Sequence, residues 1–141
     1  MNLSTSFSRT CGAAAVALAL GLAAGSALAA DTKLDGSEEV PPVTTSATGE
    51  NMVKVAADGA VSGKVTTKGI DATAAHIHNG AKGKNGPVII PLKKGDGGDF
   101  MVPADAKLTE AQMKDYKDGN LYVNVHSAAH PGGEIRDQME P

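Results

Sequence analysis

The 141-residue sequence contains one cysteine, no tryptophan, two tyrosines and two phenylalanines. The single cysteine, Cys11, lies in an apolar N-terminal segment, so the rest of the chain can form neither a disulfide nor a thiolate metal site. With so few aromatic rings, we do not expect a stacking platform for sugars or bases. Sixteen acidic residues outnumber thirteen basic ones, and this excess argues against nucleic acid or an anionic membrane surface as the partner.

The N-terminal segment has the pattern of a secretory signal peptide. A short polar start is followed by an Ala/Leu/Val run, which ends in the small-x-small sequence Ala-Leu-Ala at 27–29. The run is shorter than the roughly 20 residues that cross a bilayer, and no second segment has the character of a membrane anchor. We therefore expect residues 1–30 to be removed by cleavage after Ala29 or Ala30. A single domain over 31–141 would then be periplasmic or secreted.

The rest of the chain is typical of short strands separated by turns. Alternating side chains and the dipeptides Asp-Gly, Lys-Gly and Asn-Gly predict antiparallel strands. These strands are expected within 47–59, 60–69, 73–80, 88–92, 120–127 and 133–139. The segment 36–49 contains Pro41 and Pro42, which cannot donate to a sheet, so it is expected to be extended and at most an edge strand. The pattern indicates an all-β antiparallel β-sandwich or a small barrel.

One helix is expected to interrupt the strands. In the sequence LTEAQMKDYKDGN, Thr109 stands three residues before Gln112, as in a capping box, and Gly119 is suited to the position that follows a helix. We expect two to three turns that lie across one end of the sheets.

The four histidines are confined to two short stretches, AAHIHNG (74–80) and NVHSAAHPGG (124–133). Residues at i and i+2 of a strand share a face, so His76 and His78 should project together from one strand. His126 should project from the polar face of the other.

His130 follows four residues after His126, in a turn that contains Pro131 and two glycines. If the two strands are neighbours, three imidazoles meet on one face of the sheet and the turn presents His130 above them.

Four converging imidazoles predict a metal site. Imidazole nitrogen is a good ligand for copper and zinc, and the general order of affinity favours copper, with zinc as the alternative. The competing interpretation is that each histidine is solvated on a polar strand face.

Glu134 and Arg136 also share a face by the same spacing. One interpretation is a surface ion pair that contributes little to stability. In the other, Arg136 attracts an anion to the metal, and Glu134 accepts a hydrogen bond that orients a ligand imidazole.

Three segments together resemble the CHRD domain family. They are LDGSEEVPPVTTSATG (34–49), AAHIHNGAKGKNGPVIIPL (74–92) and GNLYVNVHSAAHPGGEIRDQM (119–139). The resemblance implies an immunoglobulin-like or superoxide-dismutase-like β-sandwich in an extracytoplasmic setting.

Two of these motifs are also similar to parts of the copper–zinc superoxide dismutases. AAHIHNG is similar to the strand H-x-H copper pair of those enzymes, and HPGGEIR is similar to their arginine loop that guides anions. The similarity implies a copper-only site of His76, His78, His126 and His130, with Arg136 as the catalytic residue that steers superoxide. Two alternatives stay open: a copper carrier with a closed four-ligand site, and a metal-free extracellular interaction module. The sequence identifies no protein partner.

Overall fold

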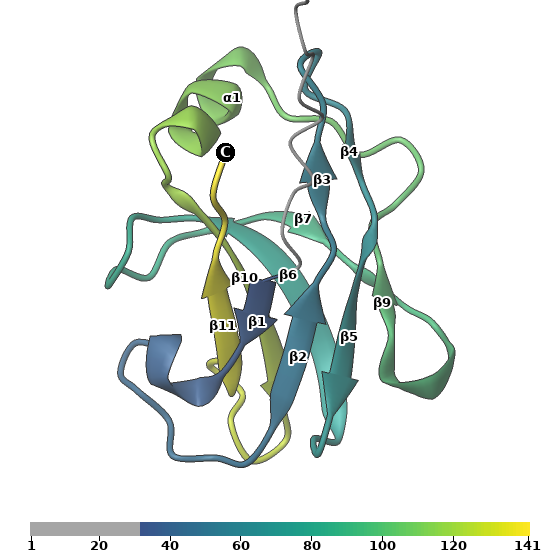
Figure 1. Cartoon of the computed structure of the whole chain (residues 1–141), viewed down its shortest axis with the longest axis vertical. Coiled ribbons are helices and arrows are strands. Elements are labelled where there is room, and N and C mark those ends of the chain that lie inside the picture. The colour runs from purple at the N-terminus through teal and green to yellow at the C-terminus, as the bar shows by residue number, and fades with distance from the viewer. Residues whose placement is uncertain (1–31) are drawn as a thin grey trace, which may run out of the picture.

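The computed structural model describes residues 32–141, and the predicted signal peptide lies outside this range. The described chain forms two packed antiparallel sheets and a small two-stranded sheet (Figure 1). The five-stranded sheet has the order β1 (Thr32–Leu34), β2 (Thr48–Asn51), β5 (Lys64–Lys68), β9 (Phe100–Met101), β8 (Lys93–Lys94). The four-stranded sheet has the order β11 (Ile135–Gln138), β10 (Leu121–Ser127), β6 (Ala72–Asn79), β7 (Val88–Pro91). The small sheet pairs β3 (Lys54–Val55) with β4 (Val61–Ser62). The predicted β-sandwich is confirmed.

The predicted helix is also present, as α1 (Glu110–Lys117) near one end of the sandwich (Figure 1). Its capping box forms as expected: the Gln112 backbone N–H donates to Thr109 Oγ1 at 3.2 Å, and the Thr109 N–H donates to Gln112 Oε1 at 2.9 Å. Gly119 follows with a φ of 74°, which suits a residue without Cβ. Two short 3-10 helices, η1 (Gly36–Glu38) and η2 (Asp96–Gly98), complete the described elements. None of the helices within 32–141 is apolar and long enough to cross a membrane.

Two predicted strands are each divided in two. The segment 47–59 forms β2 and β3, and the segment 60–69 forms β4 and β5. Gly63 stands at the second break with a φ of 107°, and a Cβ there would lie 2.1 Å from the carbonyl oxygen of Met52. This close approach of two backbones bends the ribbon, and the pairs on its two sides belong to different sheets.

Three short strands, β1, β8 and β9, lie outside the predicted ranges. Strands β8 and β9 flank the glycine turn around η2, where the residue pairs are Lys93 with Met101 and Lys94 with Phe100. A two-residue strand has no alternation to detect, so its pairing becomes visible only when the neighbouring strand β5 is in place.

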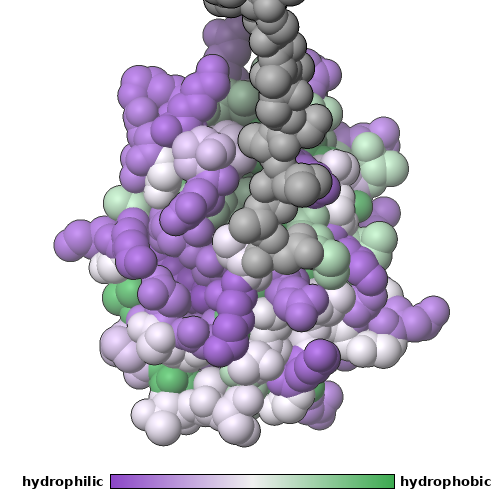
Figure 2. Space-filling model, in the orientation of Figure 1, coloured by the Kyte–Doolittle hydropathy of each residue, from purple (hydrophilic) through white to green (hydrophobic). Residues whose placement is uncertain are grey.

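The core lies between the two large sheets. From the four-stranded sheet, alternate residues point inward, and Ala75, Ile77, Val123 and Val125 are at most 1% exposed. On the surface seen in Figure 2, apolar residues show only as small separate patches among hydrophilic ones. Because β-strand side chains alternate, the inward Ala75 and Ile77 force His76 and His78 onto the outer face.

Candidate metal centre

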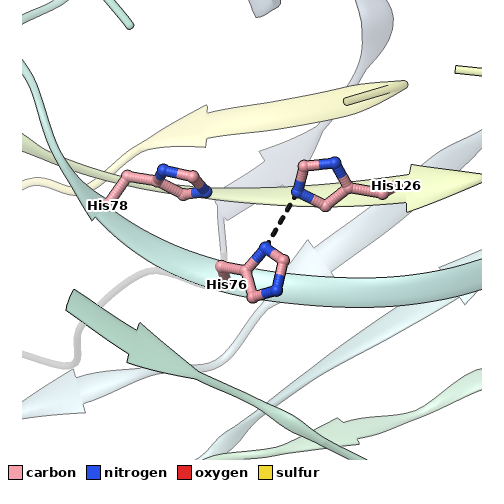
Figure 3. Close-up of side chains that lie close together, drawn as sticks. All are labelled: His76, His78 and His126. Carbon is pink, nitrogen blue, oxygen red and sulfur yellow. Dashed lines mark hydrogen bonds between the residues drawn. The ribbon is translucent and has the colours of Figure 1, made fainter. Parts of the chain in front are cut away.

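The histidine strands are neighbours, as the predicted site requires. Strand β6 runs antiparallel to β10, with His78 opposite Tyr122 and His76 opposite Asn124. His126 is opposite Ala74, one diagonal step from His76. The register therefore brings two imidazoles from β6 and one from β10 together on the outer face of the sheet (Figure 3).

The three rings are close enough to share one metal ion. Each offers one nitrogen, and the three nitrogens lie within 4.8 Å of one another. His76 Nδ1 and His126 Nε2 are 3.0 Å apart. Two nitrogen ligands at about 2.0–2.1 Å from a zinc-like ion lie about 3.4 Å apart in tetrahedral geometry and at most about 4.2 Å apart in a linear one. The widest pair would therefore need to close by up to about 1.4 Å to form a tetrahedral site.

Two of the rings are oriented by backbone carbonyls. His78 Nδ1–H donates to the carbonyl oxygen of Gly86 at 2.9 Å, and His126 Nδ1–H donates to that of Pro131 at 2.9 Å. A carbonyl oxygen only accepts, so these bonds assign the proton of each neutral ring to Nδ1 and leave the Nε2 lone pair available. Hydrogen bonds of this kind typically hold metal-binding histidines in place.

The unpaired nitrogen of His78 fits a metal ligand. Within the described residues, His78 Nε2 is buried and has no hydrogen-bond partner. A buried polar atom without a partner is unfavourable, and coordination would remove that cost. Burial also lowers the pKa of His76 and of His78 below the ordinary value, which favours the neutral ring that metal binding requires.

The residues present therefore fit a three-histidine metal site. His78 and His126 would each bind through Nε2, and His76 offers one of its ring nitrogens. Because His126 Nε2 is an acceptor, His76 Nδ1 carries the shared proton in the metal-free protein. For His76 to bind through Nδ1, this proton moves to its other nitrogen.

The fourth predicted ligand, His130, does not join the group of three. Its backbone N–H donates to Ser127 Oγ at 3.2 Å, and its carbonyl accepts from the Gly133 N–H at 3.1 Å. This tight turn brings the carbonyl of Pro131, rather than the ring of His130, against His126. The loop therefore contributes a hydrogen-bond acceptor to the site and not a fourth imidazole.

Arg136 is not placed as an exposed anion guide. Its side chain is 1% exposed, and its guanidinium carbon lies 3.4 Å from the centre of the Tyr122 ring. The same group donates to the Lys84 carbonyl oxygen at 2.9 Å and to Gln138 Oε1 at 3.1 Å. An anion arriving from solvent would have to displace these contacts, so the predicted steering role does not match this geometry.

Glu134 does not orient a ligand imidazole either. Its carboxylate accepts hydrogen bonds from the hydroxyls of Thr45 and Ser127. Burial by itself raises the pKa of Glu134, but these hydrogen bonds outweigh it and hold the pKa below its ordinary value. Backbone carbonyls take the orienting role that was predicted for this residue.

The groups that surround the three imidazoles are not among the predicted site residues. Tyr122 stacks on His78, with ring centres 4.7 Å apart and planes within 7°. Its position on the histidine face follows from strand alternation, so that pattern could have indicated it. No side-chain pattern marks the carbonyls of Gly86 and Pro131, because every residue has a carbonyl.

Comparison with protein-family models matches residues 30–139 to the CHRD domain. Comparisons with curated proteins and with solved structures found no match. The family match covers most of the chain and includes all three segments on which the resemblance was based. The chain therefore belongs to the CHRD domain family.

Proposed function

We propose that this protein is a periplasmic or secreted copper-binding protein, and that the copper site acts as a superoxide dismutase. The observation that carries the proposal is the convergence of His76, His78 and His126, with two of the rings oriented by carbonyls. A location outside the cytoplasm is supported by the signal-peptide pattern of residues 1–30. The domain match begins at residue 30, where that pattern ends.

The donor set supports copper. Within the described chain, the candidate group consists of imidazoles alone, and the general affinity order places copper above zinc for such ligands. A bound copper ion would supply the one-electron Cu(II)/Cu(I) cycle that superoxide dismutation needs.

The number of ligands favours turnover over storage. A carrier was expected to enclose its metal with four histidines, whereas His130 is not in the group. His76 and His126 are partly exposed, so a small molecule can approach the side of the site that they form. Three ligands leave a coordination position for such a molecule.

The test is copper and zinc titration of the purified metal-free protein, with EPR of the Cu(II) form and a superoxide assay in parallel. We expect one tight copper with nitrogen hyperfine structure, which is lost in His78→Ala. His130→Ala is the matched control and should keep the copper, because His130 is outside the group. Equal weak binding in the wild type and His78→Ala would refute the copper site and direct attention to protein partners. Tight copper without superoxide turnover would favour the carrier.

A further inference from the structure

A buried stack of three side chains crosses the four-stranded sheet beside the candidate metal centre. We propose that Arg136 and Tyr122 are positioning residues that hold the His78 ring so that Nε2 is directed at the metal. The inference rests on the proposed copper site, but part of its test uses the metal-free protein. It gives Arg136 a role through His78 in place of contact with a diffusing anion.

The first connection is the stack itself. Tyr122 lies on β10, between Arg136 on β11 and His78 on β6. The Arg136 guanidinium carbon is 3.4 Å from the Tyr122 ring centre, and the His78 ring is stacked on Tyr122 at 4.7 Å. The strand order puts these two groups on opposite faces of the Tyr122 ring. The guanidinium is attracted to the electron-rich face of the Tyr122 ring and holds that ring in place. The Tyr122 ring in turn limits rotation of the His78 imidazole.

The second connection runs through the loop of residues 80–87, between β6 and β7. Arg136 donates to the carbonyl oxygens of Lys84 at 2.9 Å and Ala81 at 3.4 Å. The same loop ends near Gly86, whose carbonyl accepts the His78 Nδ1–H bond at 2.9 Å. Two contacts restrain the His78 imidazole: the Tyr122 ring against its face and the Gly86 carbonyl that accepts from Nδ1–H. Both contacts therefore depend on Arg136.

Tyr122 joins these two connections. Its hydroxyl accepts a hydrogen bond from the Gly86 N–H at 3.1 Å. The loop is close to β6 at this point, since a Cβ on Gly86 would lie 1.7 Å from the Asn79 carbonyl oxygen. The Gly86 carbonyl is consequently held by the backbone on one side and by Tyr122 on the other.

Arg136 is buried among uncharged hydrogen-bond acceptors. Within residues 32–141 it forms no salt bridge, and burial lowers its pKa below the ordinary value. A buried cation is costly unless its donors are satisfied, and here carbonyl oxygens and an aromatic ring satisfy them. Lysine at this position would keep the charge but could not reproduce the planar set of donors.

The experiment compares three variants with a control. Arg136→Lys removes the planar donor set, Tyr122→Leu removes the stack, and Tyr122→Phe keeps the stack but loses the hydroxyl. Lys84→Ala is the control, because only its backbone carbonyl takes part. Cooperative unfolding by circular dichroism establishes that each variant is folded.

In the metal-free protein, nitrogen NMR of the imidazoles reports the His78 tautomer. We expect a single Nδ1–H form in the wild type and in Lys84→Ala, and a mixture of tautomers in Arg136→Lys and Tyr122→Leu. The copper affinity of these two variants should fall about tenfold to a hundredfold, the range typical for residues behind metal ligands, and the EPR hyperfine splitting should change. Tyr122→Phe should lie between them and the wild type.

Two results separate the two claims. If the wild type binds no copper but the tautomer shift occurs, the metal site is refuted and the positioning of His78 is retained. If folded Arg136→Lys and Tyr122→Leu keep the wild-type tautomer, copper affinity and spectrum, the stack serves stability alone and the inference is wrong.

Discussion

Gly132 and Gly133 are adjacent in the loop that orients His126, but the structure predicts that alanine destabilises the protein only at Gly133. Gly133 has a φ of 125°, and a Cβ there would lie 2.4 Å from Glu39 Oε1 and 2.6 Å from Asn124 Nδ2. A Cβ on Gly132 would meet no atom within 4 Å, and its backbone is ordinary. The pair is therefore a matched test of the loop geometry.

The cost of Gly133→Ala has two parts. A non-glycine residue in a sparsely populated backbone region costs about 1–3 kcal/mol. The new methyl group must also displace the side chains of Glu39, which is 4% exposed, and Asn124, which is 2% exposed, and overpacking a buried site costs about 1–3 kcal/mol. The two parts share atoms and do not add fully, so we expect a loss of about 3–4 kcal/mol. Gly132→Ala should be neutral or stabilise by up to about 1 kcal/mol, because it restricts the unfolded chain.

Urea unfolding of the metal-free protein measures both changes. With a slope of about 1–3 kcal/mol per molar urea, the midpoint of Gly133→Ala should fall by at least about 1 M, and that of Gly132→Ala should be unchanged or higher. If the free energies of unfolding of the two variants agree within about 0.5 kcal/mol, the close packing of Gly133 against Glu39 and Asn124 is wrong.

Three further predictions concern stability. Burial raises the pKa of Glu134, but hydrogen bonds from two hydroxyls outweigh it and hold the pKa below 4.5. The wild type should therefore be more stable than Glu134→Gln above that pH, and it should lose this advantage as the pH falls. Burial raises the pKa of Asp137 above 3.8, so the folded state favours the protonated carboxyl. Relative to Asp137→Asn, the wild type should therefore lose stability as the pH rises from 3.8 through the pKa of Asp137 in the folded protein. Urea unfolding of each pair between pH 3 and 8 checks both signs, and a pH-independent difference contradicts them. Ile77→Ala should cost about 2–5 kcal/mol in the same assay yet keep copper, because Ile77 points into the core; loss of copper in the folded variant would contradict the assignment of the two strand faces.

Much of the fold could be predicted because its signals are local. Strand alternation places His76 and His78 on one face and Ile77 on the other, and this holds whichever strand is the neighbour. The helix start at Thr109 depends on residues within one turn, and it was predicted correctly. The very short strands β8 and β9 carry no comparable signal, because β8 pairs with β9, and β9 pairs with β5, a strand much earlier in the chain.

The residues of the candidate site likewise differ in whether local sequence signals could predict their positions. Strand periodicity and the clustering of the histidines pointed to His76, His78 and His126 as a group, and the antiparallel register brings their rings together. His130 and Arg136 could not be placed in this way. His130 lies in a turn whose hydrogen bonds direct the Pro131 carbonyl toward the site, and Arg136 lies against a ring from the adjacent strand.

The sequence by itself determined which side chains share a face of each strand, where the helix begins, and that thiolates have no part in the site. Tertiary structure alone decided which of the four imidazoles converge, which backbone carbonyls orient them, and that Arg136 is buried under Tyr122 and not open to solvent. The physical reason is range: alternation and capping act over a few residues, whereas register, loop closure and burial are settled by contacts between segments distant in the chain.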